Sequence, residues 1–137
     1  MVGDTAKKVL VIEGAPEFSE LYKEILEMNG WQVVCAGTGK EGLLSLVRLE
    51  APDFVILDIN LPDLNGFEIL QAIHERGIST KVLVITGTGS IDQAVKAMLM
   101  GAEEFLEKPI DPERFLSTIK KMFDIPSSTH TKHPPPS

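Results

Sequence analysis

Two kinds of hydrophobic pattern alternate along the chain. Short runs of mainly apolar residues bounded by turn residues are typical of strands buried in a sheet. The second run is more polar than the others, which favours a place near an edge of the sheet. The predicted strands cover residues 9–12, 31–36, 54–57, 82–85 and 104–106.

The segments between these runs carry apolar residues at three- and four-residue steps, which predicts amphipathic helices. The first helix should begin at Pro16 and end at Asn29–Gly30, with one buried stripe made of Phe18, Leu21, Ile25 and Met28. Capping residues precede the other helices: Thr38 with Glu41, Asn65, Ser90 with Gln93, and Asp111 before Pro112.

Five strand–helix units follow one another without a large gap. This alternation predicts an α/β fold, a doubly wound parallel sheet with helices on both faces and right-handed crossovers. We expect a single domain at residues 1–125. Residues 126–137 are rich in proline and polar residues and lack apolar periodicity, so we expect a disordered tail or a truncated linker there.

The composition narrows the choice of partners. A net charge of −7 over 137 residues argues against a nucleic-acid-binding surface and suits cations or a basic partner. Cys35 is the only cysteine, so no internal disulfide can form and a reducing, cytoplasmic setting is expected. No apolar stretch approaches the roughly 20 residues of a membrane-spanning helix.

Polar side chains follow four of the predicted strands. The carboxyl ends of parallel strands lie at one edge of a sheet, where open α/β folds bind their ligands. Those ends carry Glu13 beside Gly14, Asp58, Thr86 and, after the last strand, Lys108.

A carboxylate can act as a nucleophile toward phosphorus. The charge of the transferred group would need to be neutralised, and a lysine and a threonine hydroxyl suit two of its oxygens, while a divalent cation suits a third. Asp58, Glu13 and the backbone carbonyl of Asn60 are oxygen ligands of the kind that Mg²⁺ uses. Taken alone, Asp58 is more simply a turn residue, and the chemical interpretation depends on Thr86 and Lys108 in register with it.

These residues resemble the receiver domain of two-component response regulators. The resemblance runs from about Lys7 to Phe123 and is specific because its motifs are spread over four strand–helix units. It implies a flavodoxin-like fold with five flanking helices and strand order 2-1-3-4-5. The motifs are Asp58 with Pro62 and Gly66, Thr86 with Gly87, Gly101–Ala102, Phe105, and Lys108–Pro109.

The resemblance implies a signalling domain rather than an enzyme. Asp58 would accept a phosphoryl group from a histidine kinase or phosphotransfer protein in the presence of Mg²⁺. Lys108 would bind that group, Thr86 would move to hydrogen-bond it, and Phe105 would swing between outward and inward positions. The face formed by residues 90–123 would then contact an output domain, a partner protein or a second copy of the chain. The family often has a cis bond at the position of Lys108–Pro109.

The sequence departs from the family pattern at one position. The family usually has two adjacent acids after the first strand, whereas this chain has Glu13 followed by Gly14. A missing carboxylate beside a divalent ion should cost on the order of a few kcal/mol, or roughly one to three decades of affinity. Glu13 is longer than aspartate and could reach inward, and water could replace the missing ligand.

Two other functions are compatible with the residues. The departure at Gly14 motivates a degenerate receiver, a protein-interaction module that does not need phosphorylation. A small phosphatase acting through an aspartyl-phosphate is a remote alternative, because such enzymes usually have a second aspartate where this chain has Asn60.

A glycine motif suggests a nucleotide site that we reject. Residues 37–42 match G-x-G-x-x-G, and Asp58 follows at about the distance of a ribose-binding acid. A loop with a capping box is the simpler interpretation, and the nucleotide interpretation would leave Thr86 and Lys108 unexplained.

Overall fold

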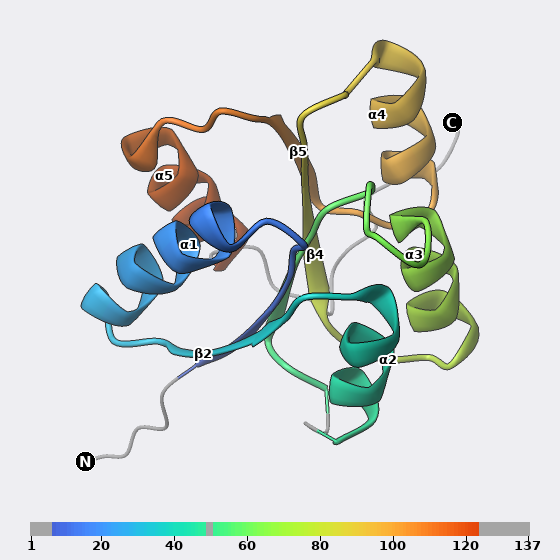
Figure 1. The fold of residues 1–137 in the computed structure, drawn as a ribbon, viewed down its shortest axis with the longest axis horizontal. Coiled ribbons are helices and arrows are strands. Elements are labelled where there is room, and N and C mark those ends of the chain that lie inside the picture. The colour runs from blue at the N-terminus through green and yellow to red at the C-terminus, as the bar shows by residue number, and fades with distance from the viewer. Residues whose placement is uncertain (1–6, 49–50, 124–137) are drawn as a thin grey trace, which may run out of the picture.

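The computed structural model describes residues 7–48 and 51–123, which contain ten regular elements (Figure 1). The expected tail at residues 126–137 lies outside the described residues. The strands are β1 (Lys8–Ile12), β2 (Gln32–Ala36), β3 (Phe54–Leu57), β4 (Lys81–Thr86) and β5 (Glu104–Glu107). The helices are α1 (Pro16–Met28), α2 (Gly39–Arg48), α3 (Gly66–Glu75), α4 (Ile91–Leu99) and α5 (Pro112–Phe123).

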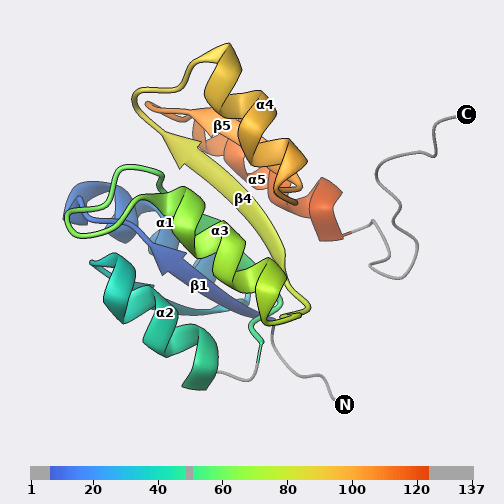
Figure 2. The ribbon, with the colours of Figure 1, turned by 90° about the vertical axis from the view of Figure 1, so that its right-hand side faces the viewer.

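The five strands form one parallel sheet in the order β2-β1-β3-β4-β5. Helices α1 and α5 cover one face, and α2, α3 and α4 cover the other (Figures 1 and 2). The predicted fold class and strand order are therefore confirmed. The more polar strand β2 lies at one edge, as its composition favours.

Alternate residues of the central strands pack into two separate hydrophobic cores, one on each face of the sheet. In β1, for example, Leu10 and Ile12 pack beneath α2 and α3, while Val9 and Val11 pack beneath α1 and α5. All four are at most 1% exposed, which explains why the strand is an unbroken apolar run rather than an alternating one. None of the helices in the described segments reaches the length and hydropathy that crossing a bilayer requires.

The predicted helix starts are present, but the capping boxes are only half formed. The Ser90 hydroxyl accepts from the Gln93 backbone N–H at 3.1 Å, yet the Gln93 side-chain oxygen has no hydrogen-bond partner among the described residues. The Thr38 hydroxyl accepts from the Glu41 N–H at 3.1 Å, and the Glu41 carboxylate bonds the N–H of Gly37 instead of returning to Thr38. One side of each box is therefore sufficient to start its helix.

The predicted buried stripe of α1 is wrong at its last position. Met28 is 79% exposed, whereas Tyr22 and Leu26 are fully buried. At about 100° per residue, Met28 lies about 160° around the helix from Leu26 and points to solvent. Phe18, in the first turn of the helix, is half-buried at the same edge of the sheet as the carboxyl end of β1.

Asp63 caps helix α2 from a distant loop. Its carboxylate accepts the backbone N–H groups of Gly39 at 2.7 Å and Lys40 at 3.0 Å. These are the amides that a phosphate would need if the glycine motif bound a nucleotide. Their bonds to Asp63 support the loop-and-cap interpretation of residues 37–42.

The Asp63 cap should make stability depend on pH. Desolvation raises the pKa of Asp63, but the backbone hydrogen bonds together outweigh it and hold the pKa below its ordinary value. A depressed folded-state pKa stabilises the fold above the unfolded-state value of ~4, and this stabilisation is lost as pH falls through the folded-state pKa. Wild type should therefore be more stable than Asp63→Asn at neutral pH, with the difference shrinking below about pH 4. Urea unfolding from pH 3 to 7 measures this, and a constant difference would contradict it.

Candidate functional site

The candidate residues extend the strands at the carboxyl edge of the sheet. The N–H of Asp58 donates to Ile12 at 3.0 Å, and the N–H of Glu13 donates to Ala36 at 3.0 Å. The N–H of Lys108 donates to the carbonyl of Thr86, also at 3.0 Å. The Lys108–Pro109 bond is cis. The sheet ladder thus continues into the loops and fixes where each side chain begins.

Lys108 joins the two acids. Its Nζ lies 2.8 Å from Asp58 Oδ2 and 3.0 Å from both carboxylate oxygens of Glu13. Asp58 and Glu13 are 5% and 4% exposed. Two carboxylates and one ammonium held away from water leave an excess negative charge at the site. Glu13 does reach inward, as its extra methylene allows.

Burial and pairing act in opposite directions on these groups. Burial alone would lower the pKa of Lys108, but the hydrogen bonds to Asp58 and Glu13 raise it above its ordinary value. Burial raises the pKa of Glu13, and the nearby Asp58 charge adds to this. The hydrogen bonds that Glu13 accepts from Ala15 and Lys108 oppose the shift without cancelling it. Lys108 therefore stays charged at neutral pH.

Asn60 connects Asp58 to Thr86. Its backbone N–H donates to Asp58 Oδ1 at 2.9 Å, while its side-chain Nδ2 donates to Thr86 Oγ1 at 3.2 Å and also to the Thr88 hydroxyl. Thr86 is fully buried. The sequence pointed only to the backbone carbonyl of Asn60, and its side-chain bridge was not anticipated. A change at Asp58 therefore has a short hydrogen-bonded route to the loop after β4.

Gly66 closes the loop after Asp58. Its N–H donates to the carbonyl of Ile59 at 2.7 Å, and Asn60 and Asn65 form an isolated antiparallel bridge. A Cβ at Gly66 would lie 2.6 Å from both the Asp58 carbonyl oxygen and the Ile59 Cα. Only glycine fits between α3 and the chain that carries the acid.

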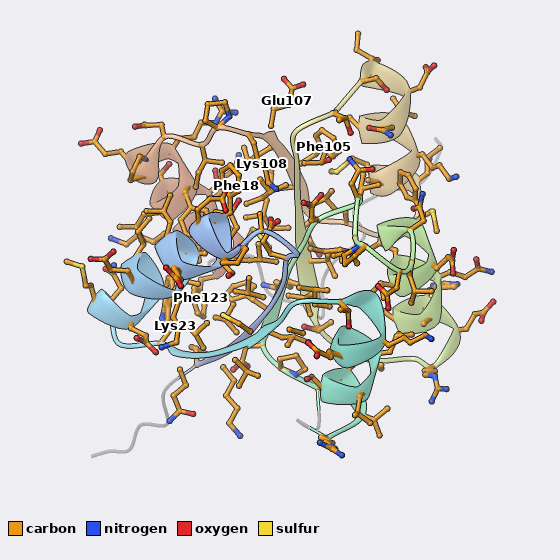
Figure 3. The ribbon with its side chains drawn as sticks, in the orientation of Figure 1. Phe18, Lys23, Phe105, Glu107, Lys108 and Phe123 are labelled. Carbon is orange, nitrogen blue, oxygen red and sulfur yellow. The ribbon has the colours of Figure 1, made fainter. Side chains whose placement is uncertain are left out.

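Phe105 lies on β5 toward α4, beside the loop after β4 (Figure 3). It is half-buried against the core beneath α4. A Cβ at Gly89 would come within 3.0 Å of its ring. The ring and this loop are in close contact, so a movement of either one requires the other to adjust.

Two aromatic residues of α1 belong to the site although the sequence pattern assigned α1 only to packing. Lys108 Nζ lies 4.2 Å from the centre of the Phe18 ring, and the two are adjacent in Figure 3. Tyr22 is fully buried, and its hydroxyl has no hydrogen-bond partner among the described residues. Burial, then the charges of Glu13 and Asp58, raise its pKa. The position of Phe18 in the first turn after β1 is the signal that could have identified it.

The donor set partly fits a divalent cation. Asp58, Glu13 and the Asn60 carbonyl could hold Mg²⁺ with water completing its shell. The described residues contain no group of three or more acidic, histidine or cysteine side chains that could hold a metal ion. A side chain at Gly14 would begin 3.1 Å from the Pro62 ring. At this edge of the sheet the described residues therefore offer a cation two carboxylates, Glu13 and Asp58.

Comparison with known proteins agrees with this geometry. A family model described as the response regulator receiver domain matches residues 9–120. The regulatory protein LuxO of Vibrio cholerae is 35% identical over 109 residues, which are 80% of this chain and 24% of that protein. The chain spans between 24% and 48% of the length of the curated relatives it matches most strongly.

Solved structures resemble the chain along nearly all of their length. The signal receiver domain of a LuxO-type repressor from Vibrio parahaemolyticus is 32% identical with a TM-score of 0.82, and the match covers 85% of this chain and 89% of that one. The beryllofluoride-activated NtrC4 receiver domain, solved as a dimer, is 40% identical with a TM-score of 0.79, covering 85% and 96%.

Proposed function

Because the chain belongs to the family of response regulator receiver domains, we propose that it is switched by phosphorylation of Asp58. The observation that carries the proposal is the contact of Lys108 Nζ with Asp58 Oδ2 at 2.8 Å, at the edge where Thr86 also lies. The phosphoryl donor would be a histidine kinase or a phosphotransfer protein. An oxygen of Asp58 would bond to phosphorus as the bond from phosphorus to the donor nitrogen breaks.

Lys108 and Thr86 would stabilise the transferred group. Lys108 already contacts Asp58 and would move its hydrogen bonds to a phosphoryl oxygen, which carries more charge than the carboxylate alone. Thr86 would have to give up the hydrogen bonds it accepts from Asn60 and from the N–H of Thr88, which is 3.4 Å away. Lys108 and Thr86 would thus exchange one set of hydrogen bonds for another, and neither would form or break a covalent bond.

Mg²⁺ would lie against Asp58, Glu13 and the Asn60 carbonyl. Bound there, it would neutralise charge on the transferred phosphoryl group. The chain buries the Asp58 carboxylate and orients it through the hydrogen bond from the Asn60 N–H.

The signal would leave through the face formed by residues 90–123. The rearrangement of Thr86 would reach Phe105 through the Gly89 loop, which contacts the ring. A groove of about 650 Å³ runs along this face between α4, β5 and α5. Helix α4 presents exposed apolar side chains beside it: Ile91, Val95 and Leu99. These features suit contact with an output domain, a partner protein or a second copy, in the cytoplasm.

The proposal is tested by loading the protein with an acyl phosphate and Mg²⁺. Intact mass spectrometry should detect one added phosphoryl group, and Asp58→Asn should take up none. Beryllofluoride, which mimics the phosphoryl group and is not hydrolysed, should shift the backbone amide signals of Thr86 and Phe105 in NMR spectra. A wild type that neither gains mass nor responds to beryllofluoride would contradict the proposal.

A second candidate function is a degenerate receiver. Gly14 and the pairing of Lys108 with both acids favour it, because the ammonium already balances part of the charge that a metal would balance. Such a module would bind its partner equally well with Asp58 intact or replaced by asparagine. Partner binding by the wild type that depends on beryllofluoride would eliminate this candidate.

A further inference from the structure

The ammonium of Lys108 has an aromatic neighbour in addition to its two carboxylates. The Phe18 ring centre lies 4.2 Å from Nζ, and the Lys108 side chain is only 11% exposed. A cation over an aromatic face is attracted by the ring quadrupole, and the attraction grows when water is excluded. The Lys108 side chain is largely shielded from solvent, so this contact should be stronger than one at the surface.

The chain fixes Phe18 in place from two directions. Pro16 begins α1, and the Phe18 N–H bonds the carbonyl of Ala15 at 3.0 Å. The N–H of Ala15 in turn donates to Glu13 Oε2 at 3.0 Å. One turn of chain therefore positions both the Phe18 ring and the Glu13 carboxylate around the same ammonium.

We propose that Phe18 is a positioning residue that holds the Lys108 ammonium against Asp58 and Glu13. Its consequence for phosphoryl transfer rests on the proposed function of the site, whereas the positioning itself does not. An aliphatic residue at this place would fill the space without attracting the cation. Lysine has a long, flexible side chain, so an anchor beyond the two carboxylates limits the positions it visits.

Packing alone is the competing explanation for Phe18. Its ring also lies 6.3 Å from the ring of Tyr22, centre to centre. Phe18→Leu keeps an apolar side chain and removes the aromatic face, while Phe18→Tyr keeps the face. Phe123→Leu makes the same chemical change at a ring near Lys7, whose Nζ is 5.3 Å from that ring centre.

The positioning is measured on the ammonium itself by NMR. In wild type the Lys108 side-chain protons should show an upfield ring-current shift, and its ammonium protons should exchange slowly with water. Phe18→Leu should speed that exchange by about threefold or more. Phe18→Tyr should restore the protection, and Phe123→Leu should leave it unchanged. Urea unfolding of each variant establishes that it is folded.

The rate of phosphorylation by an acyl phosphate gives the functional result. Phe18→Leu should be phosphorylated about three- to tenfold more slowly at saturating Mg²⁺, with the rate recovered in Phe18→Tyr. An absent ring-current shift in wild type, or equal ammonium exchange in wild type and Phe18→Leu, would overturn the inference. If wild type accepts no phosphoryl group, the proposed function fails, and the exchange measurement still decides whether Phe18 positions Lys108.

Discussion

Replacing Gly66 with alanine is expected to lower the free energy of unfolding by about 2–4 kcal/mol. The added Cβ would lie 2.6 Å from two backbone atoms, the Asp58 carbonyl oxygen and the Ile59 Cα. Backbone cannot turn aside as a side chain can, so α3 must move away from the loop. That movement would break the 2.7 Å hydrogen bond from the Gly66 N–H to Ile59.

The sign of this effect makes it a sharp test. Alanine favours helices over glycine by about 1 kcal/mol, so helix propensity alone would make the Gly66→Ala protein more stable. Gly37→Ala, in the loop before α2, is a control for the glycine-to-alanine change where there is space, because a Cβ there meets only Glu41 Oε1 at 3.8 Å. The control should change stability by no more than about 0.5 kcal/mol. Equal urea midpoints for the two variants would contradict the prediction, because they would mean that the loop accommodates a Cβ at Gly66 without cost.

The order and type of the elements could be predicted from hydrophobic periodicity, because a strand that is buried on both faces is an unbroken run of apolar residues. Val9 to Ile12 must be apolar at every position, since alternate residues face different cores. Helix faces were less well determined. Met28 follows Ile25 by three residues, but it lies on the far side of α1 from Tyr22 and Leu26, which form the buried centre of the helix. A stripe predicted through Phe18, Leu21 and Ile25 is displaced from that centre.

The convergence of Glu13, Asp58, Thr86 and Lys108 could be predicted because strand ends fix where a loop begins. The contacts made by their neighbours could not be predicted in this way. The bridge from Asn60 to Thr86 and the ring of Phe18 near Lys108 depend on rotamers and loop paths. Sequence spacing contains no information on either. The same is true of Asp63, which caps α2 through hydrogen bonds to Gly39, 24 positions away, and Lys40, 23 positions away.

Replacing Gly14 with aspartate is expected to raise the affinity for Mg²⁺ by about one to three decades. Within residues 7–48 and 51–123, Glu13 and Asp58 are the carboxylates that Lys108 already pairs with at the candidate site. A third acid would add negative charge that Lys108 does not already balance, and this charge would attract a divalent ion. Gly14 is not in the left-handed region of backbone conformation, so aspartate requires only a shift of a few tenths of an ångström at Pro62.

Gly14→Asn separates charge from shape in this experiment, because it makes the same contact with Pro62 and adds no charge. Calorimetric titration with Mg²⁺ should rank the affinities with Gly14→Asp well above both Gly14→Asn and wild type. Equal affinities for Gly14→Asp and Gly14→Asn would contradict the charge argument. A wild type that already binds Mg²⁺ as tightly as Gly14→Asp would mean that Glu13 and water complete the site. That result would also remove the main support for a degenerate receiver, because Asp58 would then have the metal its phosphorylation needs.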